Sequence, residues 1–187
     1  MAVPQIIILN GTSSAGKSST AKALQKIANG FFLHIAFDTF LEMLPHKLWR
    51  HPDGINFDQQ EGPDGPAVTV ELGSKVLDAL AGMRSAVGAL ARQGNQLIVD
   101  DLLLSSHDQQ DYRRFLDGLE YRFVGLFAPL VVLEERERQR GDRMLGLARW
   151  QFDRVHNGVS YDLEIDTSLS STQECAQMIA TKFGLLP

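Results

Sequence analysis

The residues most able to do chemistry form one short segment near the N-terminus. Residues 11–18 read Gly-Thr-Ser-Ser-Ala-Gly-Lys-Ser, which matches the pattern G-x-x-x-x-G-K-[ST]. The glycines of such a loop let backbone N–H groups turn inward around an anion, and the helix that follows adds its positive end. Lys17 adds a point charge for the β- and γ-phosphates of ATP, and Ser18 offers a hydroxyl to Mg²⁺. The predicted nucleotide contacts are Gly11, Thr12, Ser13, Ser14, Ala15, Gly16, Lys17, Ser18 and Ser19.

One carboxylate that could act in phosphoryl transfer follows the apolar run 33–37. This residue is Asp38, and ligands of open α/β sheets bind beyond the carboxyl ends of the strands, where the phosphate loop also lies. Asp38 is predicted to be the general base that accepts or orients the proton of an acceptor hydroxyl. The alternative is an N-cap for a helix that begins near Thr39.

Two further carboxylates, Asp100 and Asp101, follow the apolar run 97–99 in a pattern that resembles a Walker B element. Adjacent residues of a strand point to opposite faces, so one of the two is expected to face the phosphate loop. Asp100 is predicted to hold Mg²⁺ directly or through water, which leaves Asp101 for substrate or structure. A cap of a helix or turn is the alternative for this pair.

Charged residues are concentrated between 134 and 143. On a helix, Arg136, Arg140 and Arg143 share one face because they are spaced i, i+4 and i+7, while Arg138 can pair with Glu134. Three like charges on one face repel unless an anion lies opposite them, and the phosphates of ATP would be that anion. The segment 134–149 is therefore predicted to form an arginine-rich lid, with Arg140 and Arg143 stabilising charge in the transition state. A solvated helix face is the alternative.

The elements that must position these residues alternate between strand and helix, which predicts a parallel sheet covered by helices on both faces. The chain has no repeat or linker, so one domain over residues 1–187 is expected. Apolar runs of strand length occupy 6–10, 33–37, 97–99, 121–127 and 163–166. Helical spacing begins after Lys17 and recurs at 71–93, 108–119, 129–141, 144–156 and 171–183.

The segment 46–66 interrupts this alternation. It is rich in proline and glycine and contains Trp49 and Phe57, which favours a long loop or a small hairpin. Long irregular segments of compact domains are often functional, so a flap on the substrate side is predicted. A disordered surface excursion is the alternative.

The bulk composition is that of an ordinary globular protein. Hydrophobic residues make up 44% of the 187 residues, and the net charge of −5 disfavours a nucleic-acid partner. The only cysteine, Cys175, excludes an internal disulfide and is expected in the core. No window has the roughly 20 apolar residues of a membrane helix, and no signal peptide is present, so a cytoplasmic location is predicted.

These motifs together resemble the chloramphenicol phosphotransferase family. The resemblance rests on 8–18, the Phe-Asp-Thr-Phe segment 37–40, Val-Asp-Asp at 99–101, Arg-Gly-Asp-Arg at 140–143 and the segment 159–168. It implies a kinase-type P-loop fold, a three-layer α/β/α arrangement whose five parallel strands follow the order 2-3-1-4-5. It also implies transfer of the ATP γ-phosphoryl group to the primary hydroxyl of chloramphenicol with Mg²⁺, and a role in antibiotic resistance. In the family pattern Asp38 corresponds to the base, Lys17 to the lysine of the phosphate loop, and Arg140 and Arg143 to lid arginines. Thr167 would lie near the adenine.

The acceptor is the least determined part of this interpretation. Segment 46–66 carries no motif that ties it to chloramphenicol. A nucleoside, shikimate-like or sugar acid kinase is the alternative within the class, and a regulatory P-loop ATPase or nucleotide-binding switch is the alternative outside it. A nucleic-acid kinase is disfavoured by the acidic charge. A homo-oligomer is compatible with the sequence.

Overall fold

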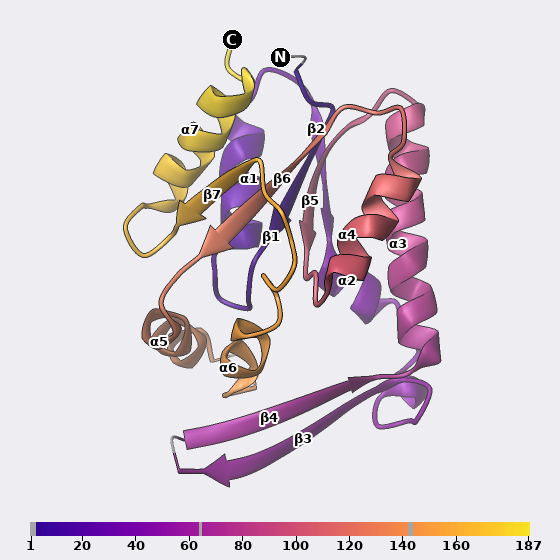
Figure 1. The fold of residues 1–187 in the computed structure, drawn as a ribbon, viewed down its shortest axis with the longest axis vertical. Helices are drawn as coiled ribbons and strands as arrows, with labels where there is room; N and C mark the ends of the chain where they lie inside the picture. Colours follow the sequence, from indigo (N-terminus) through magenta and orange to yellow (C-terminus); the bar gives the residue numbers. More distant parts are fainter. Residues whose placement is uncertain (1–2, 64, 142–143) are drawn as a thin grey trace.

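The structure, a computed structural model, shows a parallel sheet between two layers of helices (Figure 1). It describes residues 3–63, 65–141 and 144–187. The strands are β1 (Ile6–Asn10), β2 (Phe32–Ala36), β3 (Ile55–Gly62), β4 (Gly65–Leu72), β5 (Gln96–Asp101), β6 (Tyr121–Phe127) and β7 (Leu163–Asp166). The helices are α1 (Lys17–Ile27), α2 (Phe37–Glu42), α3 (Ser74–Arg92), α4 (Ser106–Phe115), α5 (Leu130–Arg140), α6 (Leu147–Phe152) and α7 (Thr172–Phe183), with a short 3₁₀ turn, η1, at His46–Leu48.

The main sheet confirms the predicted fold class and strand order. Its strands lie in the order β2-β5-β1-β6-β7, which is 2-3-1-4-5 when the five parallel strands are counted along the chain. All five residues of β1 are buried, because the central strand is covered on both faces. Leu9 pairs with Asp100 and Asn10 with Asp101, so the carboxyl ends of β1 and β5 lie level with each other.

The two faces of the sheet have separate cores. Helices α1 and α7 cover one face, where the apolar core includes Leu24, Ile179 and Cys175, so the expected burial of the cysteine is confirmed. Helices α3 and α4 cover the other face, where Val87 and Leu116 pack against β1 and β5. Across the described ranges, no helix is both long and apolar enough to cross a bilayer.

The segment after η1 is an antiparallel hairpin of β3 and β4, longer than the sequence suggested. It ends at Leu72, so the prediction that the following helix begins at residue 71 and includes Leu72 is wrong. Leu72 pairs with Ile55 across the hairpin, which satisfies the backbone as a strand. At Gly73 an added Cβ would lie 2.3 Å from the carbonyl oxygen of Pro52, so only glycine fits where the chain turns into α3.

The helices at the carboxyl ends of the strands also differ from the prediction. The helix expected over 144–156 is only the six residues of α6, and turns follow it. Helix α5 ends at Gly141, whose φ of 70° is left-handed, as is common at helix ends. The predicted pairing of Arg138 with Glu134 is wrong, because Arg138 pairs with Glu135 and Glu134 pairs with Arg149 of α6.

Candidate active site

The phosphate loop joins the end of β1 to the start of α1, and its backbone is curled. Ser14 has a φ of 62° and Gly16 a φ of 89°, both in the left-handed region. Such a sequence of conformations turns successive N–H groups to one side, where they form a nest for an anion. The hydroxyl of Ser14 is buried and has no hydrogen-bond partner within the described residues. A buried donor of this kind is satisfied when an oxygen-rich ligand occupies the loop.

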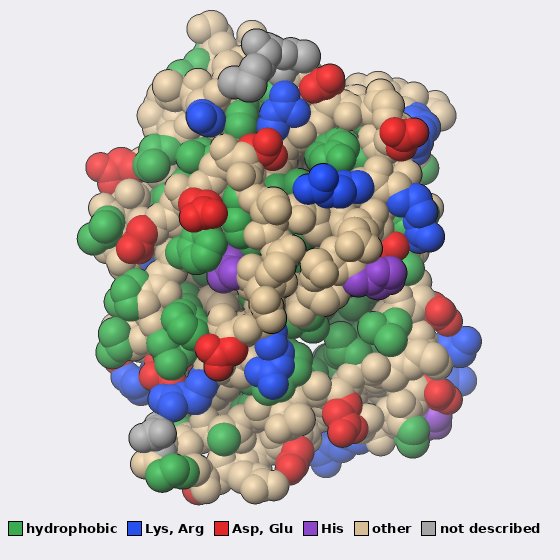
Figure 2. All heavy atoms as spheres, viewed as in Figure 1, with side chains coloured by type: hydrophobic (Ala, Val, Ile, Leu, Met, Phe, Trp, Pro, Cys, Tyr) green, Lys and Arg blue, Asp and Glu red, His purple; other side chains and the backbone are tan. Residues whose placement is uncertain are grey.

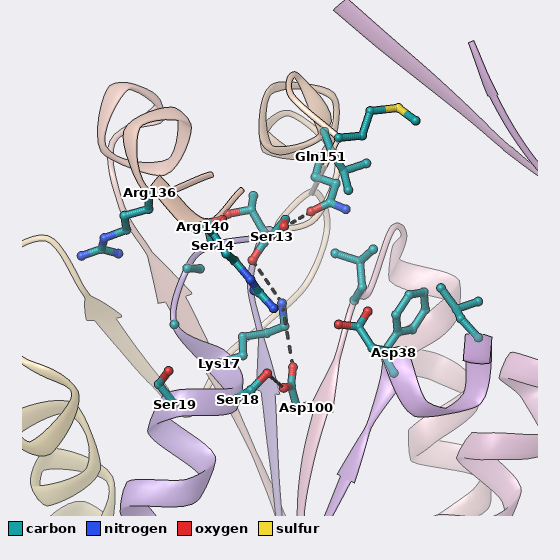
Figure 3. A pocket seen from close by; sticks show the side chains of 18 of the residues that line it. Ser13, Ser14, Lys17, Ser18, Ser19, Asp38, Asp100, Arg136, Arg140 and Gln151 are labelled. Atoms are coloured by element: carbon teal, nitrogen blue, oxygen red, sulfur yellow. Dashed lines mark hydrogen bonds and ion pairs between the residues drawn. The ribbon is translucent and has the colours of Figure 1, made fainter. Parts of the chain in front are cut away.

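Lys17, Ser18 and Asp100 meet beneath this loop (Figure 3). The Ser18 hydroxyl donates to Asp100 Oδ2 at 2.5 Å, and Lys17 Nζ lies 3.9 Å from Oδ1. Lys17 also donates to the carbonyl oxygens of Gly11 at 2.8 Å and Thr12 at 3.1 Å. The Lys17 ammonium group is thus held against its own loop.

The environment of Asp100 keeps it ionised. Burial alone would raise the pKa of Asp100, but His34, Lys17 and Ser18 outweigh that effect and bring the pKa below its usual value. His34 Nε2, in β2, lies 3.7 Å from Asp100 Oδ2. A carboxylate that stays charged beside a hydroxyl can serve as an oxygen ligand for a hard cation.

Asp101 points to the opposite face of β5, as the alternation of strand residues requires. It is fully buried, accepts a hydrogen bond from the Tyr112 hydroxyl at 2.8 Å, and lies 3.6 Å from Arg84 Nε. Burial raises the pKa of Asp101 despite the opposing charge of Arg84. The geometry therefore places Asp100, and not Asp101, beside the phosphate loop.

Asp38 lies in the first turn of α2, across the cavity from Lys17. The alternative that Asp38 is an N-cap is wrong, because α2 begins at Phe37 with Ala36 as its N-cap and has no side-chain cap hydrogen bond. Figure 3 shows the Asp38 carboxylate directed into the cavity on the side away from Arg136.

One cavity of about 1230 Å³ brings these groups together. It lies between the phosphate loop, α2, helices α5 and α6, and the hairpin, and Figure 2 shows the molecule hollowed there, with hydrophobic side chains at the opening. Of the predicted site residues that the structure describes, Gly11 does not line this cavity. The candidates that do are Thr12, Ser13, Ser14, Ala15, Gly16, Lys17, Ser18, Ser19, Asp38, Asp100, Arg136, Arg140 and Thr167.

The predicted lid arginines take different positions. Arg136 donates to Thr167 Oγ1 at 3.0 Å and to the Thr167 carbonyl oxygen at 2.7 Å, which ties α5 to the loop after β7. Arg140 extends toward Lys17, so the two cations lie close together in the cavity (Figure 3). Arg143, the third arginine of the predicted face, lies outside the described residues.

Three side chains at this site were missed by sequence reasoning. Gln151 of α6 accepts a hydrogen bond from the Ser13 N–H at 2.5 Å. Glu137 of α5 is buried against the start of α6 and accepts from Gly146 N and Ala148 N, both at 2.8 Å. His34 could have been found from the sequence, because it lies two residues before Ala36 in β2. Residues spaced by two point to the same face of a strand, and here that face borders the site. For Gln151 and Glu137, no local pattern indicated a role.

A phosphate loop at the carboxyl edge of a parallel sheet, with carboxylates and arginines around one cavity, is the arrangement of a P-loop phosphotransferase. The family described as chloramphenicol phosphotransferase-like protein matches residues 4–184. This chain therefore belongs to the chloramphenicol phosphotransferase-like family, and the resemblance noted in its motifs is confirmed.

Similar proteins are also named as phosphotransferases. In each of two strains of Mycobacterium tuberculosis, a protein named "Putative O-phosphotransferase" is 30% identical over 188 residues, covering 98% of this chain and 84% of the relative. The chain is thus a phosphotransferase by family and by relatives.

Solved structures show the same fold. A sugar kinase from Janibacter has a TM-score of 0.69 at 15% identity, with 97% of this chain and 95% of that chain covered. The APS kinase CysC of Mycobacterium tuberculosis has a TM-score of 0.66 at 15% identity, with 98% and 99% covered. The tunicamycin resistance protein of Deinococcus radiodurans has a TM-score of 0.64 at 26% identity, with 98% and 97% covered.

Proposed function

We propose that this protein transfers the γ-phosphoryl group of ATP, with Mg²⁺, to a hydroxyl group of a small molecule. The observation that carries the proposal is that Lys17 and Asp38 face one cavity from two sides. A phosphate held by the loop and a hydroxyl held by Asp38 would meet between them. This is the geometry that phosphoryl transfer requires, because the reaction depends chiefly on positioning and on charge stabilisation.

The donor nucleotide would lie along the lid side of the cavity. The curled backbone at 12–16, the Ser14 hydroxyl and Lys17 offer hydrogen-bond donors to its phosphates. Arg136 lies at the end of the cavity away from Asp38, together with its hydrogen-bond partner Thr167, and the nucleoside would lie there. Ser19 and Arg140 complete this set, and Arg143 is proposed with them from the sequence.

The residues around Asp100 fit Mg²⁺. The described residues include no group of three or more His, Cys, Asp or Glu side chains that could hold a metal by themselves. Ser18 and ionised Asp100 instead offer two oxygens at one point, 2.5 Å apart. Mg²⁺ is usually held by one or two protein oxygens together with phosphate oxygens and water, which is what this site provides. When bound, the ion would offset negative charge on the β- and γ-phosphates.

The transfer step assigns one task to each side chain. The acceptor oxygen forms a bond to the γ-phosphorus as the bond from that phosphorus to the β–γ bridging oxygen breaks, and ADP leaves. The Asp38 carboxylate orients the acceptor hydroxyl and takes its proton. Lys17 and Arg140 stabilise the charge of the transferring group, and the closed lid excludes water.

The acceptor side of the cavity favours a molecule with an apolar or aromatic body. Trp49 and Phe57 of the flap stack with ring centroids 6.2 Å apart, and Phe37 of α2 lines the same region. A polyhydroxylated sugar acid would need many polar partners, whereas among the described lining residues between 37 and 72 only Asp38, His46 and Arg50 are polar. We therefore favour an acceptor like chloramphenicol over a sugar acid. The further apolar lining residues are Leu41, Ile55, Val70, Leu72, Leu102, Leu104 and Met144.

The test is a product screen by mass spectrometry. The protein is incubated with Mg-ATP and, in separate reactions, chloramphenicol, tunicamycin, nucleosides, shikimate and gluconate. A mass gain of one phosphoryl group on an acceptor, with equal formation of ADP, is expected. ATP hydrolysis at the same slow rate with every acceptor would instead indicate a nucleotide switch and overturn the proposal.

A further inference from the structure

Gln151 is a buried polar side chain at the site that the proposed chemistry does not yet use. It lies in α6, is 5% exposed, and lines the cavity. Figure 3 shows it above the phosphate loop, with its amide group between Ser13 and the side of the cavity that Asp38 lines. It thus overhangs the place where the terminal phosphate of the nucleotide and the acceptor would meet.

The orientation of the Gln151 amide is fixed by its partner. The Ser13 N–H can only donate, so the atom that lies 2.5 Å from it must be the Gln151 carbonyl oxygen. The NH₂ end of the amide then necessarily points the other way. Nε2 donates no hydrogen bond to any residue that the structure describes, and it is not among the buried atoms that lack a partner, so it faces the open cavity. An oxygen atom of a ligand in the cavity would give this NH₂ group an acceptor.

The helix that carries Gln151 is held firmly in place. Glu137 of α5 accepts from the N–H groups of Gly146 and Ala148 at the start of α6. Arg149 of α6 donates to Glu134 of α5 at 2.7 Å. These bonds join α6 to α5, so the amide is presented to the cavity in a fixed direction. A donor that is oriented before the reaction stabilises developing charge without reorganisation.

We propose that Gln151 is a further catalytic residue, whose Nε2–H donates to the γ-phosphate of the bound nucleotide while its carbonyl oxygen holds the Ser13 amide. This inference rests on the proposed function, because it needs a nucleotide in the loop. The donor acts on the terminal phosphate and not on the α- or β-phosphate, since it lies on the side of Lys17 nearer Asp38, away from Arg136 and Thr167.

The test compares two nucleotides that differ only at the terminal phosphate. Isothermal titration calorimetry with Mg²⁺ measures the Kd of ADP and of the non-hydrolysable ATP analogue AMPPNP. In Gln151→Glu, a carboxylate oxygen still accepts from Ser13, but the donor to the phosphate is lost. In Gln151→Met, a side chain of similar length removes both bonds without adding charge. The matched control is Gln110→Glu, at an exposed position of α4 outside the cavity.

Both Gln151 variants are expected to weaken AMPPNP by about tenfold or more while changing ADP by no more than about threefold, since a hydrogen bond to a charged group is lost at one phosphate only. Gln110→Glu should leave both Kd values unchanged. Equal weakening of the two nucleotides would mean that Gln151 only shapes the loop, and no change would mean that it has no role; either result overturns the inference. A wild-type protein that binds neither nucleotide would overturn the proposed function as well, which separates the two failures.

Discussion

The Glu137 carboxylate provides a direct test of how α5 holds α6 in place. Glu137 is 1% exposed, and its two oxygens accept from the backbone N–H groups of Gly146 and Ala148, each at 2.8 Å. These N–H groups belong to the first turn of α6 and have no partner within that helix, as at any helix start. Glu137→Ala would leave both of them buried without an acceptor.

The free-energy cost of Glu137→Ala can be worked out from these two hydrogen bonds. A hydrogen bond to a charged acceptor contributes about 1.5–3 kcal/mol, so the loss of two should cost about 3–6 kcal/mol. Helix α6 has only six residues, so it should open locally before the sheet unfolds. Each 1.4 kcal/mol changes the opening equilibrium about tenfold, so the amides of 146 and 148 should exchange with solvent at least about 100-fold faster.

The assay is native-state hydrogen exchange, read by mass spectrometry on peptides that cover 144–156. The matched control is Glu135→Ala, since Glu135 lies two residues earlier on the same helix, is half exposed and pairs with Arg138 on the surface. Surface pairs contribute about 0–1 kcal/mol, so exchange in this variant should change by less than about fivefold. If Glu137→Ala exchanged no faster than Glu135→Ala, the view that Glu137 positions α6 would be refuted.

Three further outcomes are expected. Lys17→Ala should abolish phosphoryl transfer while circular dichroism stays that of the wild type, because Lys17 is the cation held at the phosphate loop itself; retained turnover would contradict the loop assignment. Asp38→Asn should lower kcat strongly with little change in the Kd of ATP, and an equal loss of affinity would make Asp38 a ligand of the nucleotide or metal. Burial, with the charge of Lys17, lowers the pKa of His156 to about 4, so below pH 6.5 the unfolded chain binds a proton that the folded chain excludes. The contribution of His156 to the free energy of unfolding should therefore be fully present above about pH 6.5 and fall by about 1–2 kcal/mol toward pH 4, a range that is reduced because the ring is partly exposed. Urea unfolding of His156→Gln should lack this loss.

The arrangement around His156 gives this pH dependence a structural basis. The Tyr161 hydroxyl oxygen accepts from Asn10 Nδ2 at 2.6 Å, so its proton is directed to His156 Nδ1, 2.7 Å away. When Tyr161 donates in this contact, Nδ1 is the acceptor and the neutral ring carries its proton on Nε2. Protonation of Nδ1 would place two donors face to face beneath the phosphate loop.

Much of the fold could be predicted from the sequence because its signals are local. Continuous apolar runs mark strands that are buried on both faces, and β1 is such a run. The phosphate loop is a contiguous motif whose conformation depends on its own glycines. Asp38 and Asp100 were found because residues that follow parallel strands gather at one edge of a sheet.

The remaining features depend on contacts between distant segments. The hydrogen bond from Ser13 to Gln151 spans 138 positions, and no periodicity in either segment specifies it. The hairpin extends to Leu72 because that residue pairs with Ile55, whereas its spacing to Val76 also fits a helix. Helix/strand ambiguity of this kind is resolved by pairing partners, which a pattern read along one segment does not contain.

The charged residues of α5 show why the sequence alone could not distinguish an arginine-rich lid from a solvated helix face. The helix has no apolar stripe, and its buried residues are Leu133 and Glu137. Its charges instead have distinct directions: Arg136 to Thr167, Glu137 to the start of α6, and Arg140 toward the phosphate loop. A helix held by directional polar bonds rather than by a buried stripe can exchange partners without leaving a large apolar surface exposed to water. That property suits the role of a lid that we propose for this segment, which would open to admit a nucleotide and close over its phosphates.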